Sequence, residues 1–174
     1  ILVRTQVTKF KKLKFHTHEN LGYGEIYLPP EEMHTRSLVL LLPPESRAGK
    51  AYAALPEEVK GGVIARLGFL VKNVAPVFLL CDSGDIGVSE RLKDPHFGVP
   101  CLYVYDKYPG GTGLAEAFQE KLAAILTALA ERLTSCPCRE GCPSCIGPVG
   151  GGDTSRVEHT KAALTGFLSG WIGG

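Results

Sequence analysis

The pattern of hydrophobic and polar positions divides the chain into a strand-like first quarter and a helix-rich remainder. Apolar and polar residues alternate over residues 7–15, and further short apolar runs occupy 23–28 and 37–42. A two-residue period is typical of β-strands, and glycines and prolines separate the runs. We therefore expect an N-terminal β-meander, followed by a loop over residues 43–54.

From Pro56 onward the apolar residues recur every three or four positions, which indicates an amphipathic helix. Its expected buried face consists of Val59, Val63, Leu67, Leu70, Val71 and Val74. After Pro76, continuous apolar runs at 77–81 and 99–105 predict two buried strands. A second amphipathic pattern predicts a long helix over about 114–133.

The last predicted helix begins at Ser155, because Ser155 and Glu158 have the spacing of a capping box. This order of elements predicts an α/β or α+β domain, in which the meander and a mixed sheet pack with about three helices. Since 174 residues suffice for one ordinary core, we expect a single domain. Its expected parts are a β-rich part (1–44), an α/β part (55–134), a zinc knuckle (136–146) and a C-terminal helix (155–170).

The composition is normal for a globular domain, with 44% apolar and 21% charged residues. No continuous apolar run approaches the roughly 20 residues that span a bilayer, and we recognise no signal peptide, so we expect no membrane partner. The chain begins at Ile1 rather than at a methionine and ends in two glycines, which leads us to expect a segment of a longer protein.

Four cysteines lie within ten residues, separated by one, three and two positions. These spacings are too tight for two unstrained disulfides, but they let four sulfurs converge at about 2.3 Å on one tetrahedral Zn²⁺ ion. Four protein ligands leave no position for water, so the predicted zinc site is structural. An iron–sulfur cluster also uses four thiolates and is the main alternative. The candidate ligands are Cys136, Cys138, Cys142 and Cys145.

Zinc with four thiolates carries a net negative charge, and Arg139 and Arg156 are close enough in sequence to offset it. The knuckle connects the helix over 114–133 to the helix that begins at Ser155. We therefore expect the metal to fix the relative angle of these two helices.

The first 20 residues hold five basic residues against the single acid Glu19, although the whole chain has a net charge of only +1. Lysines interleaved with Phe10 and Phe15 suit a polyanion such as nucleic acid. A solvated strand face with its aromatic residues in the core explains the same pattern, and both interpretations stay open.

Three acidic residues, Asp82, Asp85 and Asp106, follow the ends of the predicted strands 77–81 and 99–105. Ligands of α/β sheets bind at such ends, and clustered carboxylates could hold Mg²⁺ for phosphodiester cleavage. A Mg²⁺-dependent nuclease is therefore one alternative function. Asp also favours turns and helix starts, which is the simpler explanation.

No phosphate-binding loop of the nucleotide-hydrolysing type is present. The only Gly-Lys pair, Gly49-Lys50, is followed by an alanine and has Pro44 where the first glycine is required. The glycine-rich segment 110–113 lies between a predicted strand and a predicted helix, where backbone N–H groups could hold an anion. A tight connection between the two elements explains it equally simply.

Several segments together resemble one known family. They are VTKFKKLKF (7–15), NLGYGEI (20–26), APVFLLCD (75–82), YDKYPGGTGL (105–114) and GCPSCI (141–146). This combination resembles the C-terminal zinc-binding domain of mitomycin repair factor A-type helicases, a branch of the superfamily 2 DNA helicases. The resemblance extends over almost the whole chain, and related domains also occur in phage-defence proteins.

The resemblance implies a noncatalytic domain that follows two ATPase lobes in a cytoplasmic, ATP-dependent DNA-repair helicase, associated with the nucleoid if bacterial. It also implies that the four cysteines are the zinc ligands, and that the isolated chain neither hydrolyses ATP nor unwinds DNA. Expected partners are the ATPase lobes of the same polypeptide and single-stranded DNA; a pure protein-interaction module is a further alternative. Candidate DNA contacts are Lys9, Phe10, Lys11, Lys12, Lys14 and Arg139.

Overall fold

The computed structural model describes residues 1–148 and 160–173. Its body contains an antiparallel sheet in the order β5 (Ser37–Leu41), β7 (Cys101–Asp106), β6 (Ile86–Arg91). The register pairs Leu40 with Leu102 and Val88 with Val104, so these apolar side chains share one face of the sheet and enter the core. The opposite face carries more polar residues.

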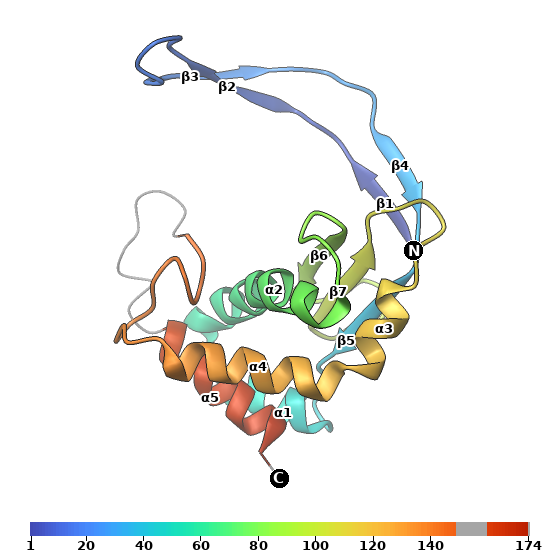
Figure 1. Ribbon diagram of the computed structural model, residues 1–174, viewed down its shortest axis with the longest axis vertical. Helices are drawn as coiled ribbons and strands as arrows, with labels where there is room; N and C mark the ends of the chain where they lie inside the picture. The colour runs from blue at the N-terminus through green and yellow to red at the C-terminus, as the bar shows by residue number, and fades with distance from the viewer. Residues whose placement is uncertain (149–159, 174) are drawn as a thin grey trace.

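Five helices are described, and the longest of them lies at the centre of the body (Figure 1). They are α1 (Arg47–Ala53), α2 (Glu57–Leu79), α3 (Leu114–Glu120), α4 (Leu122–Ser135) and α5 (Thr160–Ile172). Helix α2 contacts β6 of the sheet, and α4 and α5 contact α2 and each other. The core therefore surrounds α2, whose apolar residues Val63, Leu67 and Leu70 are completely or almost completely buried.

Helix α2 also has the length and hydropathy of a membrane-spanning helix. Eight of its residues are nevertheless buried between the sheet and the helices α4 and α5. A helix at the centre of a globular core is apolar on most sides because, like a membrane helix, it is surrounded by other apolar groups. We therefore interpret α2 as the core helix of this fold.

Residues 1–34 form a two-stranded arm that leaves the body and curves over it (Figure 1). Near the body, β1 (Leu2–Thr5) pairs with β4 (Glu31–His34), and farther out β2 (Lys9–Leu13) pairs with β3 (Asn20–Glu25). Every residue of β2 is exposed, as are the large apolar side chains of Phe15 and Tyr27. The arm thus has no core of its own, and its order rests on ladder hydrogen bonds.

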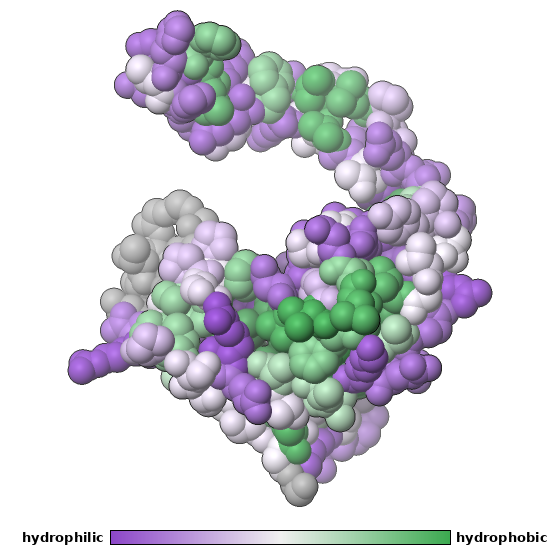
Figure 2. Space-filling model, viewed as in Figure 1, coloured by the Kyte–Doolittle hydropathy of each residue, from purple (hydrophilic) through white to green (hydrophobic). Residues whose placement is uncertain are grey.

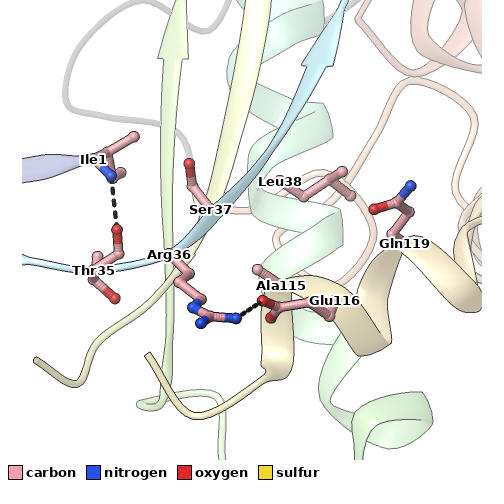
Figure 3. A pocket seen from close by; sticks show the side chains of 8 residues that line it. All are labelled: Ile1, Thr35, Arg36, Ser37, Leu38, Ala115, Glu116 and Gln119. Carbon is pink, nitrogen blue, oxygen red and sulfur yellow. Dashed lines mark hydrogen bonds and ion pairs between the residues drawn. The ribbon is translucent and has the colours of Figure 1, made fainter. Parts of the chain in front are cut away.

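The root of the arm is fixed to the body at Thr35 and Arg36. The buried hydroxyl of Thr35 donates to the backbone oxygens of Asp106 and Tyr108, at 2.8 and 2.9 Å. Figure 3 shows Arg36 reaching toward α3, where its guanidinium pairs with Glu116 at 2.5 Å. Thr35, Arg36 and Glu116 line a hollow of about 450 Å³ between the arm and α3. Their contacts fix the direction in which the arm extends from the body.

The α+β fold class is confirmed, with four corrections to its details, and the structure describes five helices where about three were expected. The sheet is antiparallel rather than mixed, and the N-terminal strands form the arm instead of a meander that continues into β5. The expected loop over 43–54 contains α1, which begins because the Ser46 hydroxyl accepts a hydrogen bond from the N–H of Gly49. The long helix predicted over 114–133 is interrupted at Lys121 and forms α3 and α4.

The predicted strand at 77–81 is wrong, because α2 continues through Pro76 to Leu79. Proline removes one backbone donor, yet the apolar residues keep a helical period across it. Val74, Phe78 and Cys81, spaced by four and three residues, pack against the core, whereas Val77 and Leu80 are exposed. The strand β6 that follows was not predicted.

The predicted capping box at Ser155 and Glu158 lies outside the described residues. The last helix is described from Thr160, and its residues Leu164, Phe167 and Leu168 are buried against α1 and α4.

Leu80 ends α2 in an unfavourable backbone conformation. Its φ of 55° and ψ of 45° lie in the left-handed region, and its side chain is 90% exposed. Glycine or asparagine usually occupies such a position, since a side chain there costs about 1 kcal/mol. The turn lets the N–H groups of Leu80 and Cys81 donate to the Pro76 carbonyl, but the exposed Leu80 side chain adds little packing.

We expect Leu80→Gly to raise the free energy of unfolding of this chain by about 0.5–1 kcal/mol, because it relieves the left-handed strain. Lys72→Gly, inside the same helix, is the matched control and should lower it by about 0.5–1 kcal/mol. Urea denaturation followed by circular dichroism measures both. Destabilisation by Leu80→Gly would contradict this explanation of the helix end.

Candidate metal centre

The four cysteines of the predicted site lie together just after the C-terminal end of α4. Four of their Sγ–Sγ distances are 3.5, 3.6, 3.5 and 3.7 Å, and all four sulfurs lie within 4.8 Å of one another. Sulfurs at about 2.3 Å from a shared tetrahedral zinc ion lie about 3.8 Å apart. The donor set therefore matches one zinc ion in both chemistry and spacing.

These short distances also decide between a single ion and an iron–sulfur cluster. A cluster interposes several iron and sulfide atoms between the cysteine sulfurs and holds them farther apart than a single metal ion does. Sulfurs 3.5–3.7 Å apart leave space for one ion only. Because all four positions around that ion are taken by protein, the site is structural and offers no open position for chemistry.

The knuckle, residues 136–146, is shaped by two tight turns. Gly141 has a φ of +127°, and a Cβ at this position would overlap the Ile146 side chain, so only glycine suits it. In the second turn, the N–H groups of Cys145 and Ile146 both donate to the carbonyl of Cys142 at 3.0 Å. The N–H of Cys142 points at the Cys145 sulfur, 3.4 Å away.

Cys145 is completely buried at the end of the hydrophobic core. Burial raises the pKa of its thiol to about 12, because a thiolate without a counter-ion is poorly stabilised there. A divalent metal bound at this site would displace the thiol proton and supply the positive charge that stabilises the thiolate.

Three helices each hold the knuckle and the segment after it by one basic side chain. Arg66 of α2 donates to the Pro148 carbonyl at 2.8 Å, and Arg132 of α4 donates to the Ser144 carbonyl at 3.2 Å. Lys161 of α5 donates to the carbonyls of Cys136 and Cys138, at 2.8 and 2.5 Å. The knuckle and the segment after it together therefore join three helices, one more than the sequence predicted.

Lys161 is the cation that the sequence analysis missed. It is buried, and its Nζ lies 3.5 Å from the Cys138 sulfur, where it can offset the negative charge of a zinc–thiolate centre. The expected partner Arg139 is instead exposed on the knuckle, and Arg156 lies outside the described residues. A basic residue 16 positions after the last cysteine gave no signal, since only the fold returns α5 to the site.

The structure does not support a nuclease site at Asp82, Asp85 and Asp106. Within residues 1–148 and 160–173, only the cysteines gather as three or more ligand groups close enough to share a metal ion. Asp85 accepts from the Tyr108 hydroxyl at 2.7 Å and from the N–H of Asp82 at 2.9 Å. These two acidic residues thus order a turn.

Asp106 is fully buried and explains the glycine-rich segment 110–113. Its carboxylate accepts hydrogen bonds from four consecutive backbone N–H groups, those of Thr112, Gly113, Leu114 and Ala115. The cradle that could have held an external anion is therefore filled by the chain's own carboxylate. Of the two interpretations that the sequence left open for residues 110–113, the tight connection is therefore the right one. The bonds to Asp106 also fix the start of α3.

The candidate DNA contacts fall in two separate places. Phe10 and the candidate lysines lie on the arm, all exposed, whereas Arg139 lies on the knuckle. On the arm, Lys14 pairs with Glu19 at 3.5 Å, and Lys9 lies opposite Glu25 in the ladder. Lys11 and Lys12 form no ion pair with the described acidic residues.

Comparison with known proteins agrees with the metal centre. The family model of the MrfA Zn-binding domain matches residues 67–146, from the middle of α2 to the end of the knuckle. The ATP-dependent helicase YprA of Bacillus subtilis (strain 168) is 37% identical over 162 residues, which are 93% of this chain and 20% of YprA. Protein MJ1572.1 of Methanocaldococcus jannaschii is 37% identical over 77 residues, 42% of this chain and 69% of that protein.

Two crystal structures of the DUF1998 helicase MrfA are similar in fold. The structure bound to DNA has a TM-score of 0.68 and 33% identity over 97% of this chain, which covers 21% of that helicase chain. The structure bound to DNA and AMPPNP has a TM-score of 0.61 and 30% identity over 96% of this chain, which covers 22% of it. The chain thus spans about a fifth of the length of the helicases that it matches.

We expect Lys161→Met to weaken zinc binding about tenfold or more, because it removes the buried positive charge and leaves two knuckle carbonyls without a donor. Lys161→Arg should keep most of the affinity. Competition with a chromophoric zinc chelator measures this directly. Equal affinity of Lys161→Met and the unmodified chain would show that the lysine has no part in the metal site.

Asp106→Asn should lower the free energy of unfolding by about 2–4 kcal/mol, since an amide cannot accept from four backbone donors as a carboxylate does. Asp82→Asn, in the exposed turn, is the matched control and should change it by less than about 1 kcal/mol. Chemical denaturation of the zinc-loaded chain checks both. Similar stabilities of the two variants would contradict the role given to Asp106.

Proposed function

The chain belongs to the family of MrfA zinc-binding domains, and from that premise we propose that it is the accessory, noncatalytic domain of an ATP-dependent DNA helicase. The four cysteine sulfurs are the proposed zinc ligands. The proposal rests on the cysteine cluster, because basic side chains of three helices hold the knuckle and the segment after it. The whole chain covers about a fifth of its helicase relative YprA. Such a zinc centre stabilises the fold and has no free coordination position for catalysis.

The first proposed role is to brace the ATPase lobes of the same polypeptide. Apolar side chains gather on the surface over the C-terminal end of α2 (Figure 2), where Val77 is 73% and Leu80 90% exposed. A groove of about 520 Å³ beside them is lined by Phe69 and Phe78 and reaches the knuckle at Pro143. Contiguous apolar surface of this kind marks a contact with another protein surface.

The second proposed role is to guide single-stranded DNA along the arm. Lys11 and Lys12 have no acidic partner among the described residues, and Phe10 lies on the same strand with Lys12 5.8 Å from its ring. Unpaired lysines attract phosphates, and an exposed ring can stack on a base. Arg139 lies on the knuckle and would contribute a separate contact.

The parent protein would then work on DNA in the cytoplasm, on the nucleoid if it is bacterial, and in DNA repair as the resemblance implies. The competing function is that of a protein-interaction module. If the arm does not bind DNA, the apolar surface at Val77 and Leu80 favours a pure protein-interaction module.

The zinc-loaded chain should bind a fluorescent oligothymidine at low salt, with an affinity that falls as salt rises. Substituting Lys11 and Lys12 together by glutamine should weaken binding and reduce the logarithmic salt slope by about one to two. Lys50→Gln combined with Lys72→Gln removes the same charge elsewhere and should leave the slope unchanged.

Fluorescence anisotropy at several salt concentrations measures these slopes. If the unmodified chain shows no binding at low salt, the DNA role is wrong and the interaction module is favoured. If both double variants lose binding equally, the arm is not the site of contact.

A further inference from the structure

The outer face of the β5-β7-β6 sheet is the floor of a groove that none of the roles above uses. Its volume is about 660 Å³, in the range of ligand-binding pockets. One wall is the root of the arm at residues 1–5, and the other is the loop that contains Asp94 and Phe97. Tyr103 and Tyr105, on the central strand β7, alternate with core residues and therefore point into this groove.

The side-chain ring of Tyr105 covers the backbone of Gly87 on the neighbouring strand. Gly87 of β6 is its partner in the ladder, and a Cβ at Gly87 would overlap the Tyr105 ring. The absence of a side chain thus allows the ring to rest on the backbone of β6, with its other face available to the groove. A ring supported in this way is a rigid stacking surface, because little conformational freedom is lost when a ligand stacks on it.

The other aromatic groups of the groove are also held in place. The Tyr103 hydroxyl donates to Asp94 at 2.8 Å, and the N–H groups of His96 and Phe97 donate to the other oxygen of Asp94, at 2.8 and 3.0 Å. Asp94 is buried, and its carboxylate is occupied by these three donors. The one acidic residue that lines the groove is therefore committed to holding the loop.

The charge that remains available to a ligand is positive. Arg91 of β6 donates to the Ser89 hydroxyl and to the Glu90 carbonyl, both at 3.0 Å, and forms no ion pair with the acidic residues of the described segments. Arg4 lines the opposite wall and has only an exposed pair with Glu32 at 3.5 Å. Supported rings between two guanidinium groups are complementary to bases linked by phosphates.

We propose that this groove binds a short stretch of single-stranded DNA, with one base stacked on Tyr105 and a neighbouring phosphate held by Arg91. The inference rests on the proposed function, in which the domain meets single-stranded DNA, and it assigns a second contact distinct from Lys11 and Lys12. Strand β1 is both part of the arm and a wall of the groove. A single strand of DNA that follows the arm toward the body would therefore reach the groove at Arg4.

The test is photocrosslinking of the zinc-loaded chain to an oligonucleotide that carries 5-iodouracil, followed by mass spectrometry of the crosslinked peptide. The expected product joins the base to Tyr105, or to Tyr103 beside it. Crosslinks found only at Phe10 or Phe15 would overturn the proposal while preserving DNA binding by the arm.

Affinity of variants provides the second measurement. Tyr105→Val, which keeps an apolar strand residue, should weaken binding of oligothymidine about tenfold, whereas Tyr105→Phe should stay within about twofold. Arg91→Gln should weaken binding and lower the salt slope by about 0.7, the value for one phosphate contact on a single strand. Each variant is compared at equal zinc content and equal unfolding midpoint.

The outcomes separate this inference from the proposed function. A chain that binds no single-stranded DNA contradicts both. Unchanged binding by Tyr105→Val and Arg91→Gln, together with loss on substitution of Lys11 and Lys12, contradicts the groove alone. If the groove binds an extended peptide and the oligonucleotide does not compete with it, the groove is a protein-docking site and the proposal is wrong.

Discussion

Four cysteine sulfurs converge at the end of α4, and we propose that the zinc ion they hold is the constraint on which the arrangement of the helices depends. Cys145 and Ile146 belong to the core, so the knuckle is a continuation of the packed interior and not an appendage. Basic side chains from α2, α4 and α5 hold its backbone and that of the segment after it. Without a metal, four partly or fully buried sulfurs and a buried lysine would lie together with no ion to organise them, which is a costly arrangement.

The arm has the opposite physical character. It extends from a firmly bonded root at Thr35, yet it buries almost no apolar surface and exposes Phe15 and Tyr27. A two-stranded ladder of this kind is only marginally stable in water, and binding a partner would lower the free energy of its ordered state. A zinc-centred body with a weakly stabilised arm, whose Lys11 and Lys12 pair with no described acidic residue, suits the proposed division between contact with the ATPase lobes and contact with DNA.

Local signals in the sequence were sufficient for the cysteine cluster and for most of the core face of α2. The cysteine spacing alone predicted the cluster, and the apolar period predicted the buried residues of α2. Residues 77–81 were predicted as a buried strand because they are all apolar. In the structure α2 continues to Leu79, and Val77 and Leu80 are apolar but exposed. The contacts of Lys161 and Asp106 could not be predicted, because only the fold brings their partners near. Lys161 reaches the knuckle carbonyls from α5. The Asp106 carboxylate fills the backbone N–H cradle of residues 112–115, which the sequence alone could not show.

Hydrogen exchange of the chain with and without its metal tests the central claim most directly, after metal analysis has established the zinc content. We expect one zinc ion per chain. On its removal by a chelator, amide protection should fall in α5, the end of α4 and the neighbouring part of α2, and the arm should be unaffected. A chain that holds no zinc, or one whose helices keep their full protection after the zinc is removed, would contradict the claim that the metal organises this fold.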